Sequence, residues 1–225
     1  YAFTASVGYR EGWDYPLTFG GVNEHQLCAG ASTGGSVRDE VEALTPWPKT
    51  ALGDFMMTLV LERCKTAREA VKLVGELTEK YGARGDIYTI GDKDEAWVIE
   101  QYQGYHWVAA RVPDDKFVIM ANCFRLGEID LDDPDNFMGS ADIKDFAREH
   151  GLWDPEKGPF HASLAYGTRE MPAPRNYPSG YTGSTLRSHG NQLRVWGGIK
   201  TLKPSADIDP LDPSKDYELF WEPDD

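Results

Sequence analysis

The sequence predicts an α+β fold in which two helices precede an antiparallel sheet. Apolar residues recur at helical spacing through two adjoining segments, 51–64 and 66–82. The period then changes to that of strands, and four β-prone runs follow with short polar turns between them, at 87–90, 96–102, 106–112 and 117–124. Because such short connections join antiparallel neighbours, we expect a meander with both helices on one face of its sheet.

The composition is that of one acidic globular domain. The chain has 225 residues, 40% of them hydrophobic, which is enough for one sizeable core. Its 37 acidic residues against 23 basic ones give a formal net charge of -14. Binding to nucleic acid or to an anionic membrane surface needs a basic face, so we expect neither partner. No apolar run approaches the roughly 18 residues of a membrane span.

Both ends of the sequence are typical of an internal portion of a longer chain. Tyr1 is not preceded by an initiator Met and begins no basic or apolar leader, and the last residues, EPDD, form neither a closing helix nor a closing strand. We therefore expect residues 1–225 to form a single domain of a longer protein. The cysteines Cys28, Cys64 and Cys123 are an odd number at wide spacings, so we expect reduced thiols rather than disulfides or a zinc site.

The N-terminal part of the chain contains few regular signals. Residues 1–19 are rich in Gly and aromatic side chains and predict irregular structure or short strands, ending at a Gly-Gly pair. Small residues alternate loosely after that pair, and we expect a closely packed strand at 26–31. The segment 33–48, with paired glycines, an acidic patch and two prolines, predicts a loop.

Two helices are predicted next, and the second has the clearer ends. The first has an apolar stripe at helical spacing, formed by Leu52, Phe55, Met56, Leu59 and Val60. The second begins with a capping box, in which Thr66 accepts a hydrogen bond from an orphan N–H and Glu69 reaches back to the cap. Gly82 supplies its C-terminal stop.

The last of the four β-prone runs carries a polar residue near its end. Residues 117–120 form a continuous apolar stretch, which is typical of a strand buried on both faces. Asn122 follows this stretch, and a buried amide without partners costs roughly 1–3 kcal/mol. The residue pattern leaves two interpretations: Asn122 either joins neighbouring backbone segments or points its NH2 group at a ligand.

The C-terminal part alternates between predicted turns and short elements. The carboxylates at 130–135 have neither the spacing nor the glycine of a calcium loop, so a solvated turn is favoured over a metal site. Ser140 is expected to cap a helix that ends at Gly151. We expect a long surface loop or crossover at 159–190 and one further element at 192–199.

The residues alone show no decisive catalytic motif. His25 and His106 suit acid or base chemistry, although such residues are more often surface or hydrogen-bonded histidines. Cys123 could act as a nucleophile beside Asn122, but no local base accompanies it and free Cys is usually buried. The seven Trp and eleven Tyr residues could line a carbohydrate groove or fill a core. On this basis the sequence predicts only an acidic α+β domain.

Six longer segments extend this interpretation. In chain order they are GGVNEHQLCAGAS, LVLERCKTAREAVKLVGELTEKYG, DKDEAWVIE, HWVAARVPDD, ANCFRLGEIDLDDPDNFMGS and RVWGG. In this order they resemble the PepD-type cysteine dipeptidases, whose relatives include the secernins. The resemblance extends over the range 20–204. It implies an N-terminal-nucleophile hydrolase, an αββα sandwich of two antiparallel sheets between helical layers, incomplete here at both ends.

The resemblance also implies a thiol mechanism. In this family the nucleophile is a cysteine at the mature N-terminus, and its own α-amine, with a pKa of roughly 7.7–8.0, acts as the base. An oxyanion hole must then stabilise the tetrahedral intermediate. By resemblance to the wider group that includes bile-salt hydrolases and penicillin acylases, Asn23 in the GVNE turn and Asn122 look like its two donors. Arg194 in LRVWGG resembles an arginine of those sites.

The chain departs from the family at its N-terminus. Members carry a substantial segment before the GVNE turn, and that segment starts with the nucleophilic cysteine. None of Cys28, Cys64 and Cys123 occupies the required place. We therefore expect the nucleophile to lie outside this chain, and the chain alone to be inactive. The missing first strand would leave a sheet edge exposed.

The function predicted for the full-length protein is hydrolysis of short peptides. Dipeptides with a free amino terminus are the expected substrates, and no cofactor is expected. A related N-acyl amidase is the alternative among enzymes. A non-catalytic, secernin-like binding protein and a carbohydrate-binding module are the alternatives of other classes. Assembly into a homo-oligomer is compatible with the sequence but is not predicted by it.

Overall fold

The structure is built on one large antiparallel sheet. The computed structural model describes residues 1–8, 17–34, 37–46, 48–53, 55–168, 189–209 and 219–224. Seven strands pair in the order β1-β2-β3-β4-β5-β6-β8, each antiparallel to its neighbours. Their bounds are Phe3–Gly8 (β1), Leu17–Asn23 (β2), Cys28–Thr33 (β3), Asp86–Gly91 (β4), Ala96–Gln101 (β5), Trp107–Arg111 (β6) and Phe137–Gly139 (β8). The predicted α+β class is confirmed.

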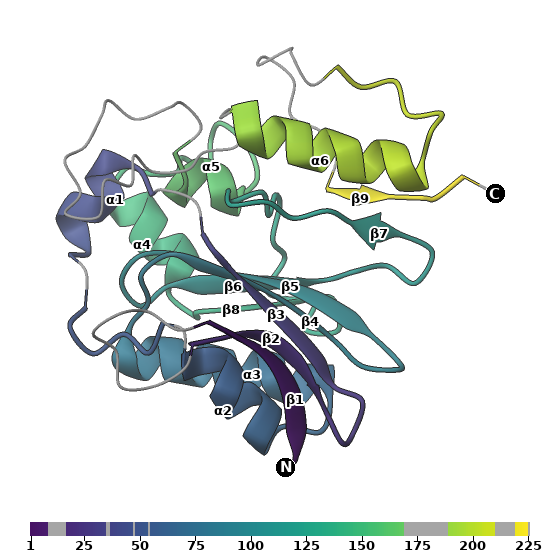
Figure 1. Ribbon diagram of the computed structural model, residues 1–225. Coiled ribbons are helices and arrows are strands. Elements are labelled where there is room, and N and C mark those ends of the chain that lie inside the picture. Colours follow the sequence, from purple (N-terminus) through teal and green to yellow (C-terminus); the bar gives the residue numbers. More distant parts are fainter. Residues whose placement is uncertain are drawn as a thin grey trace.

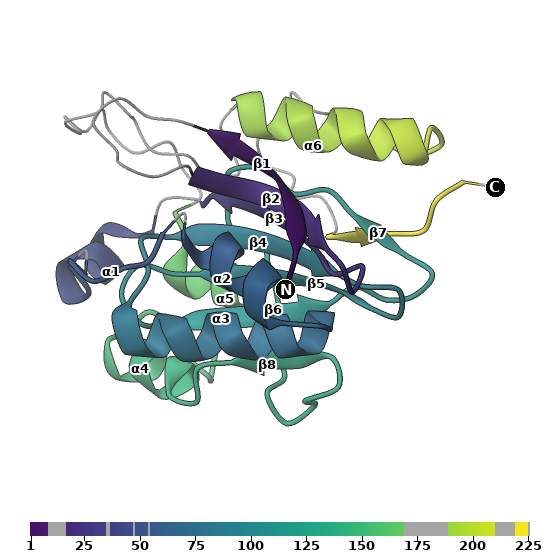
Figure 2. The same cartoon turned by 60° about the horizontal axis from the view of Figure 1, so that its bottom comes forward.

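Two helices cover one face of this sheet. They are α2 (Phe55–Arg63) and α3 (Ala67–Tyr81), and both lie on the same side of the sheet in Figures 1 and 2. Side chains of these helices and of the strands form a first core there, which includes Met56, Val60, Val71, Val74, Tyr88, Ile90, Trp97, Ile99 and Trp107. α3 approaches the sheet closely at Gly75, because a side chain at that position would overlap the indole of Trp107.

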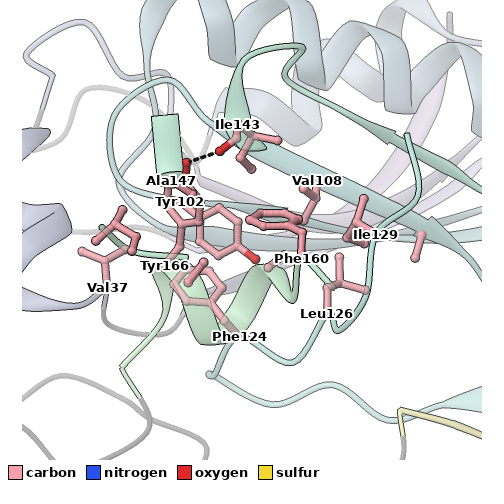
Figure 3. Close-up of a cluster of buried hydrophobic side chains, with 14 of the residues drawn as sticks. Val37, Tyr102, Val108, Phe124, Leu126, Ile129, Ile143, Ala147, Phe160 and Tyr166 are labelled. Atoms are coloured by element: carbon pink, nitrogen blue, oxygen red, sulfur yellow. Dashed lines mark hydrogen bonds between the residues drawn. The ribbon is translucent and has the colours of Figure 1, made fainter. Parts of the chain in front are cut away.

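The opposite face carries a second core that is rich in aromatic rings. Besides sheet residues it includes side chains from α4 (Ile143–Glu149) and α5 (Ala162–Tyr166). Figure 3 shows its centre, where the rings of Tyr102 and Tyr166 stack with their centroids 4.8 Å apart. The Tyr166 hydroxyl donates to the carbonyl of Ile143 at 2.8 Å, which joins α5 to the start of α4.

A further layer lies beyond that face. β7 (Phe117–Val118) pairs antiparallel with β9 (Phe220–Trp221), and α6 (His189–Leu202) packs next to this pair. A small third core joins them, formed by Ala121, Cys123, Val195, Ile199 and Ala206. In Figure 1 the layers follow in the order α2 with α3, the seven-stranded sheet, β7 with β9, and α6. Within the described residues the second sheet therefore has two strands.

The strand predicted at 117–124 is wrong for all but its first two residues. These two form β7, which pairs with β9, and β8 takes the expected place beside β6. The apolar stretch is half-buried rather than buried on both faces. Side chains replace the missing ladder: the Glu100 carboxylate accepts two main-chain N–H groups of the segment 119–126, and Arg125 donates to the carbonyl of Ile119 at 2.7 Å.

Two local predictions also differ from the structure. The segment 33–48 is not all loop, because the short helix α1 (Asp39–Leu44) forms within it. Three acidic residues in its first turn complement the helix dipole, a signal that the prolines nearby obscured. Ser140 does not cap α4, which begins after Asp142 without a side-chain cap. The Ser140 hydroxyl instead accepts the main-chain N–H of Trp107 at 3.0 Å.

The helix predicted at 66–82 is confirmed as α3, including its two ends. The Thr66 hydroxyl accepts from the main-chain N–H of Glu69 at 3.2 Å, and Gly82 follows the helix with a φ of 82°. The Glu69 carboxylate reaches one residue further back than expected and accepts from the N–H of Lys65 at 2.8 Å. The strands predicted in the central meander and the helix before α3 also appear, with shifts of a few residues at their ends.

Two predictions lie partly outside the described residues. The region 1–19 contains β1 and the beginning of β2, but residues 9–16 are not described. The predicted loop at 159–190 contains the helix α5, and residues 169–188 are not described. The element predicted at 192–199 is the helix α6. Among the helices of the described residues, none has the length and apolar character needed to cross a bilayer.

Candidate active site

Two polar side chains, Ser32 and Glu100, lie on the face of the seven-stranded sheet opposite α2 and α3. On β3, Ala29 and Ala31 belong to the side covered by α2 and α3, so Ser32 points to the opposite side. Ser32 pairs with Ile87 on β4, and Ile87 pairs in turn with Glu100 on β5. Ser32 and Glu100 therefore lie in one row, on the same face, two strands apart.

Asn122 lies over this face in the irregular segment after β7. Its Nδ2 donates to the Ser32 hydroxyl at 2.9 Å, and its main-chain carbonyl accepts from Nδ2 of Asn191 at 2.9 Å. Its Oδ1 accepts from Nη1 of Arg194 at 2.6 Å. Because a guanidinium has only donors, the amide oxygen must face Arg194, and this directs the NH2 group toward the sheet.

Arg194 comes from α6 and is held within its own helix. Its Nε donates to the carbonyl of Gly190, one turn earlier, at 3.1 Å, and its Nη2 donates to Oδ1 of Asn191. Asn191 is buried, whereas Arg194 is exposed. The structure thus brings Asn122 and Arg194 together, and a catalytic role for either residue stays a prediction.

Sequence reasoning missed two members of this cluster, Ser32 and Asn191. Asn191 stands three residues before Arg194, and on a helix that spacing places both side chains on one face. A signal for Asn191 was therefore available. Ser32 carries no comparable signal, because only the register of β3 shows that it faces Asn122.

Asn23, the other predicted oxyanion donor, lies at the far end of the β2–β3 hairpin. Cys28 lies at that end of β3, and Ser32 is roughly 13 Å further along the strand. The Nδ2 group of Asn23 donates to the carbonyls of Leu61 and Cys64, at 3.0 and 2.8 Å, and its Oδ1 accepts two main-chain N–H groups of its own turn. The structure does not bring Asn23 together with the cluster, and an oxyanion role for this residue stays a prediction.

Glu100 is a fully buried carboxylate on the same face as Ser32. Its Oε1 accepts from the main-chain N–H groups of Arg125 and Leu126, and its Oε2 accepts from the Tyr102 hydroxyl at 3.0 Å. Burial raises the pKa of Glu100 to about 7, although these hydrogen bonds and the charge of Arg125 oppose the shift. No role for Glu100 was predicted from the sequence.

The three thiols differ in exposure, and none has the setting of an activated nucleophile. Cys123 follows Asn122 but is fully buried in the third core. Cys64 is buried against α2 and α3, and burial raises the pKa of its thiol to about 11. Cys28 is exposed, at the opposite end of β3 from Ser32. Nucleophilic attack needs a thiolate that can reach the substrate, so these positions do not favour a role for any of them.

The histidines considered for acid or base chemistry lie in structural settings. His106 is buried, its ring centroid lies 4.4 Å from that of Phe146, and its Nε2 lies 3.5 Å from a carboxylate oxygen of Asp142. Burial lowers the pKa of His106, which favours the neutral ring. His25 meets the ring of Tyr1 edge-on at 4.4 Å, in the hairpin that holds Asn23.

The acidic segment 130–135 forms a largely exposed turn. The N–H of Asp132 donates to the Asp130 carboxylate at 3.1 Å, which is a local turn interaction. In the part of the chain that the structure describes, no three His, Cys, Asp or Glu side chains converge in a way that could hold a metal ion.

A groove of about 260 Å³ lies on the sheet, and none of the cluster residues Ser32, Asn122, Asn191 and Arg194 lines it. Small or apolar side chains line most of it, including Cys28, Gly30, Gly91, Val112 and Val118. Gly30 and Ser32 point to the same side of β3, so the groove and the polar cluster lie on the same face of that strand. The arrangement combines fixed amide and guanidinium donors, which suit an oxygen that gains negative charge, with nearby space for an apolar group.

Comparison with known proteins identifies a family to which this chain is similar. The model of peptidase family C69 matches residues 17–223. "Probable dipeptidase B" of Streptococcus pyogenes serotype M1 is 32% identical over 202 residues, which are 89% of this chain and 37% of that protein. "Probable dipeptidase" of Latilactobacillus sakei is 33% identical over 192 residues, 84% of this chain and 37% of that protein. The chain thus spans little more than a third of the length of these curated relatives.

Proposed function

The chain belongs to peptidase family C69, and from this membership we propose that the protein hydrolyses short peptides, with dipeptides as substrates. The observation that carries the proposal is the Asn122 amide, which the guanidinium of Arg194 orients over the sheet in a chain of this family. The names of the relatives from Streptococcus pyogenes and Latilactobacillus sakei support dipeptides as the substrate class.

The proposed reaction is acyl transfer to a cysteine. The thiolate attacks the carbonyl carbon of the peptide bond, and the amine base that removed the thiol proton returns it to the leaving amine as the C–N bond breaks. Water then hydrolyses the thioester, which releases the acid and regenerates the thiol. We place this cysteine outside residues 1–225, because Cys64 and Cys123 are buried and Cys28 is remote from Asn122.

In this proposal Asn122 stabilises the tetrahedral intermediate. Its NH2 group would donate to the oxygen that becomes negative, and Arg194 would keep the amide from flipping, because only the amide oxygen can accept from a guanidinium. Ser32 would hold the NH2 group at the sheet. Donors fixed before the substrate arrives need no reorganisation during the reaction.

The proposal extends to the fold. An N-terminal-nucleophile hydrolase has two β layers between two helical layers. The layer order of α2 with α3, the large sheet, β7 with β9, and α6 supports such an αββα sandwich. In that architecture β7 and β9 would belong to the second of the two sheets.

The proposal is tested with the native protein and a panel of dipeptides. One set has free amino termini, and a matched set carries the same residues with N-acetylated termini. We expect amine release from the free dipeptides and its loss after treatment with iodoacetamide, which alkylates thiols. Cleavage of the acetylated set alone would favour an N-acyl amidase. Binding of peptides without cleavage would favour a non-catalytic protein.

The role of Asn122 is tested by the substitution Asn122→Ala in the active protein. Loss of one oxyanion donor typically lowers kcat by about 100- to 1,000-fold, so we expect a fall of that size with a small change in melting temperature. The matched control is Asn136→Ala, which removes an exposed amide in the acidic turn. A large drop in melting temperature with normal kcat per folded molecule would contradict the role.

A further inference from the structure

The segment 119–126 carries Asn122 and pairs with no strand among the described residues. The carbonyl of Leu126 accepts instead from the N–H of Ser163 at 2.9 Å. The segment crosses the sheet face above the row that contains Ser32 and Glu100. Adjacent strands are about 4.8 Å apart, so these two residues are separated by roughly 10 Å. Ser32 and Glu100 hold the two ends of the stretch from Asn122 to Arg125, which bends at Asn122 and Cys123.

Each end of the stretch is bound to one of those side chains. The amide of Asn122 donates to the Ser32 hydroxyl. At the other end, one oxygen of Glu100 accepts the main-chain N–H groups of both Arg125 and Leu126. The guanidinium of Arg125 also donates to the carbonyl of residue 119, on the other side of Asn122, which closes the segment on itself.

We propose that Glu100 is a positioning residue, which holds the segment 119–126 on the sheet so that the Asn122 amide meets Arg194. The proposal rests on the proposed function, in which that amide stabilises the oxyanion. Among the described residues, Glu100 forms no hydrogen bond with Asn122 or Arg194; it acts through the main chain of Arg125 and Leu126. If its two N–H partners were released, the segment would lose its fixed end on β5, and Asn122 would shift relative to α6.

The chemistry of Glu100 explains why an acceptor is needed at this buried place. Both N–H groups donate to a side-chain oxygen of Glu100 on β5 rather than to a strand main chain. A buried N–H without an acceptor is costly. The carboxylate supplies that oxygen, and its second oxygen is satisfied by the Tyr102 hydroxyl.

This chemistry also predicts which substitution preserves the function. Glutamine has the same shape, and its amide oxygen can accept both N–H groups. Its NH2 group would then donate to Tyr102, whose hydroxyl can also accept a hydrogen bond. Methionine has a similar length but supplies only a weak acceptor. Glu100→Gln therefore keeps the anchor, whereas Glu100→Met removes it.

The experiment compares these two variants in the active protein by steady-state kinetics on a cleaved dipeptide. We expect Glu100→Met to lower kcat by at least about tenfold with a much smaller change in KM, because a displaced oxyanion donor affects the transition state more than substrate binding. We expect Glu100→Gln to stay within a few fold of the wild type. The control is Ile99→Ala, which damages the same strand on the opposite face, in the first core. It should lower the melting temperature while leaving kcat per folded molecule unchanged.

Hydrogen exchange of the Arg125 and Leu126 amides supplies a readout that needs no activity. Both amides should exchange at least about five times faster in Glu100→Met than in the wild type and the Ile99→Ala control. Normal kcat per folded molecule in Glu100→Met, or equal losses in the Gln and Met variants, would overturn the proposal. If the wild type cleaves no dipeptide, the proposed function fails, and unchanged exchange of the two amides would still overturn the anchoring role.

Discussion

Buried polar side chains in this chain bond to main-chain groups that regular structure leaves unpaired. Asn23 joins the β2–β3 turn to the end of α2, and Glu100 receives two N–H groups from the segment that follows β7. Arg125 donates to a carbonyl of that same segment. Nearly all buried main-chain groups in proteins are paired, so each of these side chains takes the place of a missing ladder or helix bond.

At Asn23 this interpretation predicts a loss of stability rather than of turnover. Asn23→Ala removes the partner of two carbonyls and two N–H groups at once. We expect the free energy of unfolding, measured by urea denaturation, to fall by about 2–3 kcal/mol. Asn136→Ala serves as the exposed control. A variant of normal stability with greatly reduced kcat would instead support the oxyanion role that the resemblance implies for Asn23.

At Glu100 the raised pKa predicts a pH-dependent stability. Burial raises the pKa from 4.5 to about 7, so between these values the folded chain holds a proton that the unfolded chain releases. The contribution of this group to stability is therefore fully present below about pH 4.5 and is lost as the pH rises to about 7, by roughly 3 kcal/mol at most. In urea denaturation, the free energy of unfolding of the wild type should fall relative to that of Glu100→Gln as the pH rises from about 4.5 to about 7. If the difference in free energy of unfolding between the two proteins does not change with pH, the raised pKa of Glu100 is contradicted.

The residues of the site could be predicted from the sequence only where a polar group interrupts an apolar pattern. Asn122 was found in this way, and the resemblance added Arg194. Glu100 follows an apolar pair on a β-prone run and could equally have been the exposed end of a strand. What identifies it as buried is the segment that crosses above it, and that segment belongs to a part of the chain 25 residues later.

At the scale of elements, local signals predicted α3 well and β7 poorly. α3 has a cap, a one-sided apolar stripe and a terminal glycine, and all three belong to the helix itself. An apolar β-prone run such as 117–124 shows only that the chain is extended and partly buried. Whether its main chain pairs with a strand or with side chains depends on distant residues, in this case β9 and Glu100.

The packing of α3 on the sheet predicts an unusual effect of alanine. Gly→Ala inside a helix normally stabilises by about 1 kcal/mol. At Gly75 the new methyl group would overlap the Trp107 indole, so we expect Gly75→Ala to lower the free energy of unfolding by about 1–3 kcal/mol. Gly197→Ala in α6 is the matched control, because a methyl group there meets no atom within 4 Å, and it should stabilise. Equal effects of the two substitutions in urea denaturation would show that α3 can move away from the sheet.

At the scale of the whole molecule, the three cores differ in size. The candidate site joins the large sheet, which has a core on each face, to α6, which covers the small third core. The first and second cores fill the two faces of the large sheet. Among the described residues, the third core, under α6, has the fewest buried members, with partly buried side chains such as Phe117 and Trp221 packed against it. Asn122 is bound to β3 through Ser32 and to α6 through Arg194. The geometry of the site therefore depends on the layer whose core is the smallest among the described residues.

This difference predicts that α6 opens before the rest of the molecule unfolds. Native-state hydrogen exchange, followed at increasing low concentrations of denaturant, measures the free energy of each opening. We expect amides of α6 to exchange through openings that cost less than global unfolding, and amides of β4–β6 to exchange only with it. α3 is the internal control, because it has nearly the same length as α6 but packs on the first core. Equal protection of the two helices would contradict the prediction. Lower protection of α6 would mean that the contact between Arg194 and Asn122 forms only while this layer is closed, so that closure and assembly of the site are one event.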